Sequence, residues 1–265
     1  WDAWKHRFDL FDSEHPFYQT KEERKKAVST AAFYLGLAAA DHYNHIVQRD
    51  EAVLTPAEAA RSVLVAQTFG LSGACLAIKK LSHKNSPCVA GITFLIEGDN
   101  LFQTLISNLL RYDEDHPTQE LTRTVADRPN WEADDPYEPR DRALGYLDYL
   151  TWPARGVKLK PEICEGKTIV RTYVDYVGIA PPEVLDPFKF YRKDEKAKNK
   201  TGHIAMYLSQ NRATWRNAST ILRLHSDRLR PPAALNWLAD LRRKGALGSP
   251  RAHLAGYALI VENQT

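Results

Sequence analysis

The chain has 265 residues, of which 43% are apolar and 26% charged, and its formal net charge is +3. This composition is ordinary for a soluble globular protein, and no apolar run of roughly 18 residues is present to form a membrane-spanning helix. The three cysteines, Cys75, Cys88 and Cys164, are widely spaced. Their spacing excludes a disulfide scaffold and a four-cysteine zinc site and favours a reducing compartment, so we expect a cytoplasmic protein. Because the first residue is not methionine, we also expect a piece of a larger protein.

The first half of the chain is expected to be rich in helix. Thr55 and Glu58 have the spacing of a capping box around Pro56, and Gly70 is placed to end the helix that they begin. The apolar, β-branched run Cys88–Ile96 predicts a strand. Asp99 is expected to cap a second helix. The apolar face of that helix would carry Leu101, Leu105, Ile106 and Leu109.

The second half is expected to contain more strands. It follows a proline- and acid-rich connector, Pro129–Pro139, and its clearest strand is the alternating run Thr168–Val177. Further strands are expected at Ile204–Leu208 and Leu254–Val261, and further helices at Trp215–Leu224, capped by Thr214, and between Pro231 and Gly245. This order predicts an α+β fold of mixed helices and short antiparallel sheets in one large globular domain, with a helix-rich half at 1–128 and a more β-rich half at 129–265.

Basic residues gather in several short runs. These are Lys21–Lys26, Lys79–Lys84, Arg192–Lys200 and Arg223–Arg230, and acidic runs lie at Asp113–Asp115 and Glu132–Asp135. Any one such run is typical of a solvated face. Several basic runs in one chain favour an anionic partner.

Standard catalytic signatures are missing from the sequence. It contains no GxGxxG, GxxxxGK[ST], HExxH or GxSxG pattern. Glu14 and His15, in the stretch SEHPFYQT, are an acid and a base next to each other, which is a pairing able to move protons. The run Asp113–Pro117 could bind a divalent cation, but it is more typical of an exposed loop.

Metal ligation has one weak candidate in the sequence. Asp41, His42 and His45 lie close together, but no further ligand follows at a characteristic spacing. Cys75 lies in an apolar run, which indicates packing. We therefore expect no metal site and no cofactor.

An ordered set of motifs resembles one family. The stretches are SEHPFYQT, TPAEAARSVLVAQTFGLSG, EGDNLFQTLISNLL, RPNWEADDP, GYLDYLTWPAR, RATWRNASTILRL and RPPAALNWLADL. Together they resemble CasA, the large subunit of the type I-E CRISPR surveillance complex Cascade, from about Phe8 to the end. The resemblance covers the amino-terminal globular domain of the family, and we expect its carboxy-terminal four-helix bundle to be absent.

The resemblance implies a nucleic-acid-binding subunit without catalytic activity. Members of the family contact guide RNA, inspect the protospacer-adjacent motif (PAM) of double-stranded target DNA, help to open the strands and recruit the effector nuclease-helicase. SEHPFYQT would then be structural, with His15 and Pro16 shaping a turn and Phe17 and Tyr18 filling the core. Two alternatives stay open: a hydrolase using His15 with Glu14 or the acidic run at Asp113, and a structural scaffold whose basic loops only keep it in solution.

The family resemblance also implies particular contact residues. The guide RNA would be contacted by His42, Tyr43, Asn44 and His45, where aromatic rings stack on splayed bases. The DNA and its PAM would be contacted by Gly70, Ser72, Gly73 and Ala74, with phosphate contacts from Lys79, Lys80 and Lys84. Asn263 and Gln264 lie where the family carries a hairpin that wedges into the duplex.

Overall fold

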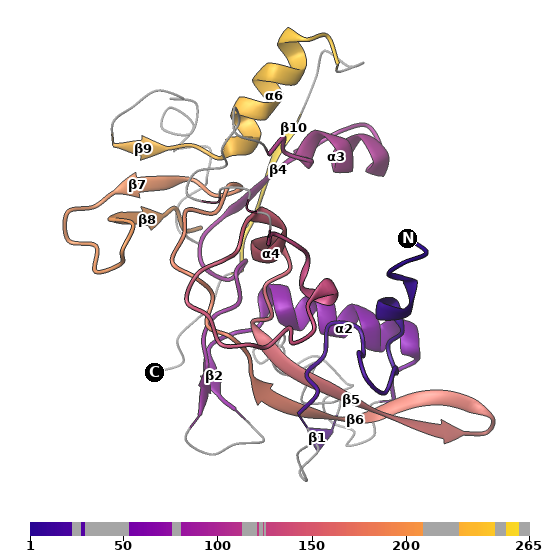
Figure 1. Ribbon diagram of the computed structural model, residues 1–265. Coiled ribbons are helices and arrows are strands. Elements are labelled where there is room, and N and C mark those ends of the chain that lie inside the picture. The colour runs from indigo at the N-terminus through magenta and orange to yellow at the C-terminus, as the bar shows by residue number, and fades with distance from the viewer. Residues whose placement is uncertain are drawn as a thin grey trace. The chain divides into compact units, whose positions relative to one another are not determined.

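The computed structural model describes residues 1–22, 28–29, 53–75, 81–112, 121, 124, 126–208, 228–246 and 253–259. The chain divides into two units, each assembled from two stretches: Trp1–Val89 with Ala126–Pro182, and Ala90–Val125 with Glu183–Thr265. Figure 1 shows helices mixed with small antiparallel sheets, so the expected α+β class is confirmed. The expected halves, the single domain and the absent bundle remain predictions. None of the helices in the described ranges has the length and apolarity needed to span a bilayer.

The first unit is built around a long antiparallel hairpin. Strands β5 (Arg155–Cys164) and β6 (Lys167–Val177) pair along their length, and the short strand β1 (Val28–Ser29) pairs with the other edge of β6. Glu165 and Gly166 join β5 to β6 with φ values of 51° and 74°. Two consecutive positive φ values are typical of the tight turn whose twist matches a hairpin.

Helix α2 (Pro56–Phe69) packs against both strands of this hairpin (Figure 1). Its start is the predicted capping box, because Thr55 accepts the Glu58 N–H while the Glu58 carboxylate accepts the Thr55 N–H at 2.8 Å. Gly70 caps its other end, as predicted. Its buried face joins the core of the unit, which consists of Tyr18, Leu54, Ala59, Val63, Val157, Leu159, Val170 and Tyr173.

The SEHPFYQT stretch is part of this core. Asp12 Oδ1 accepts the backbone N–H groups of Glu14 at 2.9 Å and His15 at 2.6 Å, which fixes the turn before Pro16. Tyr18, with a φ of 56°, is buried in the core cluster, and Phe17 packs against that cluster. The structural interpretation of Phe17 and Tyr18 is therefore confirmed.

The end of the same stretch ties the amino-terminal segment to β5. Gln19 Oε1 accepts the Leu159 N–H and its Nε2 donates to the Leu10 carbonyl, both at 2.7 Å. The Thr20 N–H donates to the Val157 carbonyl at 2.9 Å. Both Gln19 and Thr20 are buried, so these bonds satisfy polar groups that water does not reach.

Shorter elements complete the first unit. They are the 3₁₀ turns η1 (Lys5–Phe8) and η2 (Asn130–Glu132), helix α4 (Tyr146–Leu150), and strands β2 (Gly73–Ala74) and β3 (Ser82–His83), which pair with each other.

The described part of the second unit contains two small antiparallel sheets and two helices. Strand β4 (Thr93–Glu97) pairs with β10 (His253–Tyr257), and β7 (Tyr191–Lys193) lies between β8 (His203–Ala205) and β9 (Leu229–Arg230). The helices are α3 (Leu101–Asn108) and α6 (Ala233–Arg243). Ile92, Phe94 and Phe190 form the buried core. Helix α6 follows the proline pair and ends before Gly245, whose φ is 64°, as predicted.

Helix α3 corrects the sequence analysis at one point. Its cap is Asn100 rather than Asp99, because Asn100 Oδ1 accepts the Gln103 N–H at 2.9 Å. Both residue types cap helices well, so the sequence does not decide between neighbours. The apolar face predicted for this helix exists but is exposed: Leu101, Leu105 and Leu109 are 73%, 61% and 68% exposed.

Predicted strands are confirmed with shifted ends. The strand predicted at Thr168–Val177 is β6, and the one at Leu254–Val261 corresponds to β10. The strand predicted at Ile204–Leu208 was wrong over its last three residues, because β8 ends at Ala205. The prediction Cys88–Ile96 was wrong over its first residues, which form a turn containing Gly91 at a φ of 93°, so that β4 begins only at Thr93. The helix predicted at 215–224 lies outside the described residues.

Candidate nucleic-acid interface

The loop after α2 is held by backbone contacts on both sides. The Gly70 N–H donates to the Ala66 carbonyl at 3.1 Å, and the Gly70 carbonyl accepts the Ser86 N–H at 2.8 Å. The Ser72 N–H donates to Asn85 Oδ1 at 2.6 Å. Because these bonds fix the backbone, the loop presents a defined shape rather than a loose chain.

Arg155 lies beneath this loop. The residue is 5% exposed, and its guanidinium donates to the Leu71 carbonyl. Gln67 clamps its backbone, donating to the Arg155 carbonyl at 2.7 Å and accepting the Arg155 N–H at 2.8 Å. Burial lowers the pKa of Arg155 to about 10, while the charge of Asp175 opposes that shift. Arg155 therefore supports the loop from inside and is not a surface phosphate ligand.

Several residues predicted to contact DNA lie together on this loop and on the β2–β3 hairpin that follows it. Gly73 pairs with His83, so the register places Ser72 across from Lys84, and all three of Ser72, Gly73 and Lys84 are exposed. A side-chain carbon added at Gly73 would meet nothing within 4 Å. Ala74 is the second residue of β2. The arrangement leaves an open, small-residue surface beside a cation, which suits contact with a phosphate backbone.

Other predicted contact residues fall outside the described residues. These are His42, Tyr43, Asn44, His45, Lys79, Lys80, Asn263 and Gln264, together with the metal candidate Asp41 and the acidic run Asp113–Asp115.

A second basic surface lies in the second unit. Tyr191 pairs with Arg230, and the Lys193 N–H donates to the Arg228 carbonyl at 2.8 Å, so β7 and β9 run in antiparallel register. Because alternate residues of a strand share a face, the side chains of Lys193, Arg228 and Arg230 project from one side of the sheet, and all three are exposed. The two basic runs that contain these residues were visible in the sequence, but only the strand pairing shows that they meet.

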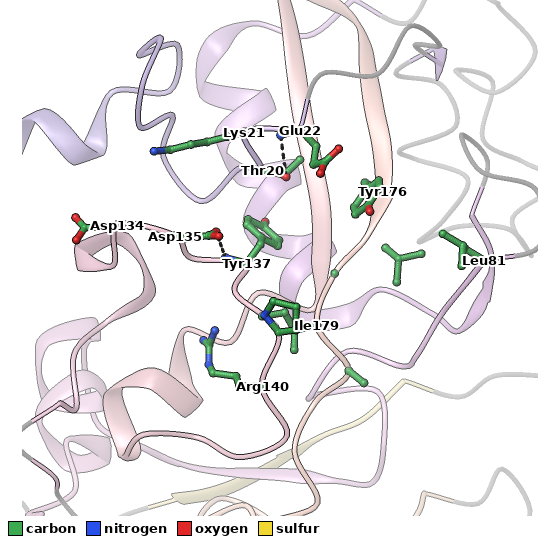
Figure 2. Close-up of a pocket in the computed structure, with 14 residues that line it drawn as sticks. Thr20, Lys21, Glu22, Leu81, Asp134, Asp135, Tyr137, Arg140, Tyr176 and Ile179 are labelled. Carbon is green, nitrogen blue, oxygen red and sulfur yellow. Dashed lines mark hydrogen bonds between the residues drawn. The ribbon is translucent and has the colours of Figure 1, made fainter.

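A cavity of about 1000 Å³ opens in the first unit, and Figure 2 shows the residues around it. It is lined by residues 20–22, 134–135, 137, 139–140 and 176–180 with Leu81. Arg140, at its edge, donates to the Asp148 carboxylate at 2.7 Å and lies 4.5 Å from the Trp152 ring centroid. Since Asp134 and Asp135 add negative charge, this cavity does not match a polyanion. The sequence offered no signal for it, because its lining comes from distant segments.

Metal ligation remains possible at one place in the described ranges. Cys75, His83 and Asp175 form a group whose ligand atoms all lie within 4.8 Å of one another.

Glu14 and His15, the candidate pair for proton transfer, lie next to each other in the turn that Asp12 fixes. Burial first, and the nearby charges of Arg7 and Lys21 second, lower the pKa of His15.

Comparison with known proteins assigns the fold to a family. The sequence model of the family described as CRISPR-associated protein Cse1 matches residues 1–265. A curated CRISPR-associated protein CasA/Cse1 of Thermus thermophilus is 29% identical over 235 residues, which cover 83% of this chain and 43% of the relative. The chain therefore spans less than half the length of that relative.

Solved structures agree with this assignment. A structure of Thermus thermophilus CasA (Cse1) matches with a TM-score of 0.74 at 26% identity, over 98% of this chain and 53% of that one. A chain of a CRISPR RNA-guided surveillance complex matches with a TM-score of 0.64 at 23% identity, over 89% of this chain and 49% of that one, and this likeness concerns the fold alone. The sequence match along all 265 residues, on a fold shared with solved CasA structures, shows that the chain belongs to the CRISPR-associated Cse1 (CasA) family.

Proposed function

We propose that this chain is a nucleic-acid-binding subunit of a type I-E CRISPR surveillance complex and has no catalytic activity of its own. In the complex it recognises the PAM of double-stranded DNA, aids strand opening and offers a surface to the effector nuclease-helicase. The observation that carries the proposal is the family match over residues 1–265. The solved relative described as an RNA-guided surveillance complex, which shares the fold, gives the role its context.

The loop after α2 is the proposed DNA-contacting element. Ser72 and Gly73 are small residues on a backbone that Arg155 and Asn85 hold in place, and Lys84 lies across the hairpin. Rigid backbone of this kind approaches a groove edge closely without losing conformational entropy on binding. Lys84, with Lys79 and Lys80, would contact phosphates that position the duplex.

Two further contacts belong to the same proposal. The stretch His42–His45 would stack on the guide RNA, and the pair Asn263 and Gln264 would form the wedge that begins strand separation. The exposed cations Lys193, Arg228 and Arg230 provide a second phosphate-binding surface in the second unit.

Salt-dependent binding to labelled duplexes tests the proposal, using the full chain assembled with guide RNA and its partner subunits. Lys84→Ala should weaken binding to all duplexes about equally and reduce the slope of log K against log salt by about one, because one phosphate contact is lost. Lys167→Ala, which removes an exposed lysine at the tip of the β5–β6 hairpin, is the matched control and should leave the slope unchanged. A loss confined to one PAM sequence would contradict a phosphate role for Lys84.

The rival functions predict different results in the same assay. A hydrolase would release product in a reaction that depends on His15 or on a metal ion, whereas the proposed subunit binds without turnover. A scaffold would show neither salt-dependent binding nor product. Failure of the unmodified complex to bind duplex DNA would overturn the proposed function as a whole.

A further inference from the structure

Three residues that are potential metal ligands converge under the loop after α2. Cys75 directly follows β2, and His83 ends β3, the strand that pairs with β2. The Cys75 N–H donates to the Leu81 carbonyl at 2.9 Å, which continues this pairing and brings the cysteine close to the histidine. Asp175 comes from β6, so the group joins the short hairpin to the central sheet of the first unit.

The ligand atoms are close enough to share one cation. His83 Nε2 lies 3.0 Å from Asp175 Oδ1, and one ligand atom of each of the three residues lies within 4.8 Å of the others. In a tetrahedral zinc site the bond lengths of about 2.0–2.3 Å place neighbouring ligand atoms about 3.3–3.7 Å apart. Small side-chain adjustments therefore bring this group to zinc geometry.

The burial of His83 is an independent indication of a ligand. The residue is 7% exposed, and neither of its ring nitrogens makes a hydrogen bond within the described part of the chain. His83 Nε2 lies 3.0 Å from Asp175 Oδ1, a close polar contact that is not a hydrogen bond. Burying an imidazole without a hydrogen bond costs free energy. A cation bound between His83 and Asp175 would remove that cost.

The donor set selects the kind of cation. A thiolate, an imidazole and a carboxylate together suit zinc and similar borderline-soft divalent ions, whereas calcium and magnesium prefer oxygen ligands. Asp175 and the metal-bound Cys75 thiolate would supply two negative charges to the cation. Cys75 is 3% exposed, so a substrate cannot reach it and a role as a nucleophile does not fit.

We propose that Cys75, His83 and Asp175 bind one zinc-like divalent cation, with water completing the coordination. Binding forms a metal–sulfur bond and releases the thiol proton to solvent. The cation would fasten the hairpin after the loop onto β6. This inference differs from the sequence-based expectation of no metal site, and it rests on the geometry of the first unit rather than on the proposed DNA contacts.

Cobalt substitution in the full chain tests the site. The protein is stripped with a chelator and titrated with Co²⁺, which reports a thiolate ligand through a charge-transfer band and a tetrahedral site through its visible bands. We expect about one equivalent to bind, Zn²⁺ to displace it, and both bands to be lost in Cys75→Ser and His83→Gln. Cys164→Ser, which removes the half-exposed thiol in the β5–β6 hairpin, is the matched control and should keep both bands.

A measurement on the unmodified chain keeps the test informative if the variants fold poorly. Zn²⁺ should raise the melting temperature of the stripped protein, whereas Ca²⁺ at the same concentration should leave it unchanged. Absence of a thiolate band in the unmodified protein would overturn the proposal. So would a band that survives Cys75→Ser and disappears in Cys164→Ser.

Discussion

Two glycines three residues apart in the loop after α2 should respond very differently to alanine. An added side-chain carbon at Gly70 would collide with the Arg155 guanidinium and lie 2.6 Å from the Ala66 carbonyl oxygen. The helix backbone cannot yield, so Arg155 must move and its bond to the Leu71 carbonyl is lost. The equivalent carbon at Gly73 meets nothing within 4 Å.

The sizes of the two effects follow from these contacts. Overpacking and loss of a charged hydrogen bond together predict that Gly70→Ala lowers the free energy of unfolding by about 2–3 kcal/mol. For a chain of this size the melting temperature should fall by about 4–12 °C. Gly73→Ala should stay within about 0.5 kcal/mol of the unmodified protein, because it removes no contact.

Thermal and urea unfolding, followed by circular dichroism, measure both variants side by side. Equal stability of Gly70→Ala and the unmodified chain would refute the packing argument, as would equal losses in the two variants. Gly73→Ala also separates stability from function. If the backbone at Gly73 approaches the duplex closely, this variant should bind DNA more weakly while its melting temperature stays unchanged.

Four more changes have expected outcomes. Asp148→Asn should cost about 3 kcal/mol of unfolding free energy in urea titrations, because Arg140 loses its partner at 2.7 Å, whereas Asp141→Asn on the exposed neighbour should be silent. Backbone hydrogen bonds, the largest from the His15 N–H, lower the pKa of Asp12 below its usual value. The stabilisation that the ionised Asp12 gives to the fold should therefore be present at neutral pH and be lost in acid as the carboxylate is protonated, so that the unfolding free energies of Asp12→Ala and the unmodified chain converge there. Tyr43→Ala should weaken assembly with guide RNA by about 1–3 kcal/mol and Tyr43→Phe hardly at all, as measured by pull-down with labelled RNA. Gln264→Ala should leave duplex docking intact and slow strand opening, read by a fluorescent base next to the PAM; an unchanged opening rate on relaxed DNA would remove the wedge role.

Local signals in the sequence predicted the elements that local chemistry decides. Helix α2 was predictable because its capping box and terminal glycine act within one turn of the chain. Strand β6 was predictable from its alternation, but its partner β5 was not. Val157 and Leu159 alternate with Lys158 and Lys160 over only four residues before Pro161, where the register of β5 shifts.

The candidate sites show the same limit. The exposed positions Ser72, Gly73 and Lys84 follow from a loop and a basic run that the sequence displays. The support that Arg155 gives to this loop could not be predicted, since nothing near Arg155 in the sequence indicates that it is buried. The approach of Cys75 and His83 to Asp175 depends on strand register across the fold, which no spacing in the sequence encodes.

The division of each unit between two stretches of chain has a consequence for synthesis on the ribosome. Strand β4 pairs Glu97 with His253, and β1 pairs Val28 with Tyr173, so each early strand emerges long before its partner. At about 5–20 residues per second, β4 waits on the order of ten seconds for β10. During that interval its apolar edge is open to wrong pairing or to capture by a chaperone. Folding yield in the cell should thus depend on the speed of translation between β4 and β10, although neither of these two strands lies at a proposed site.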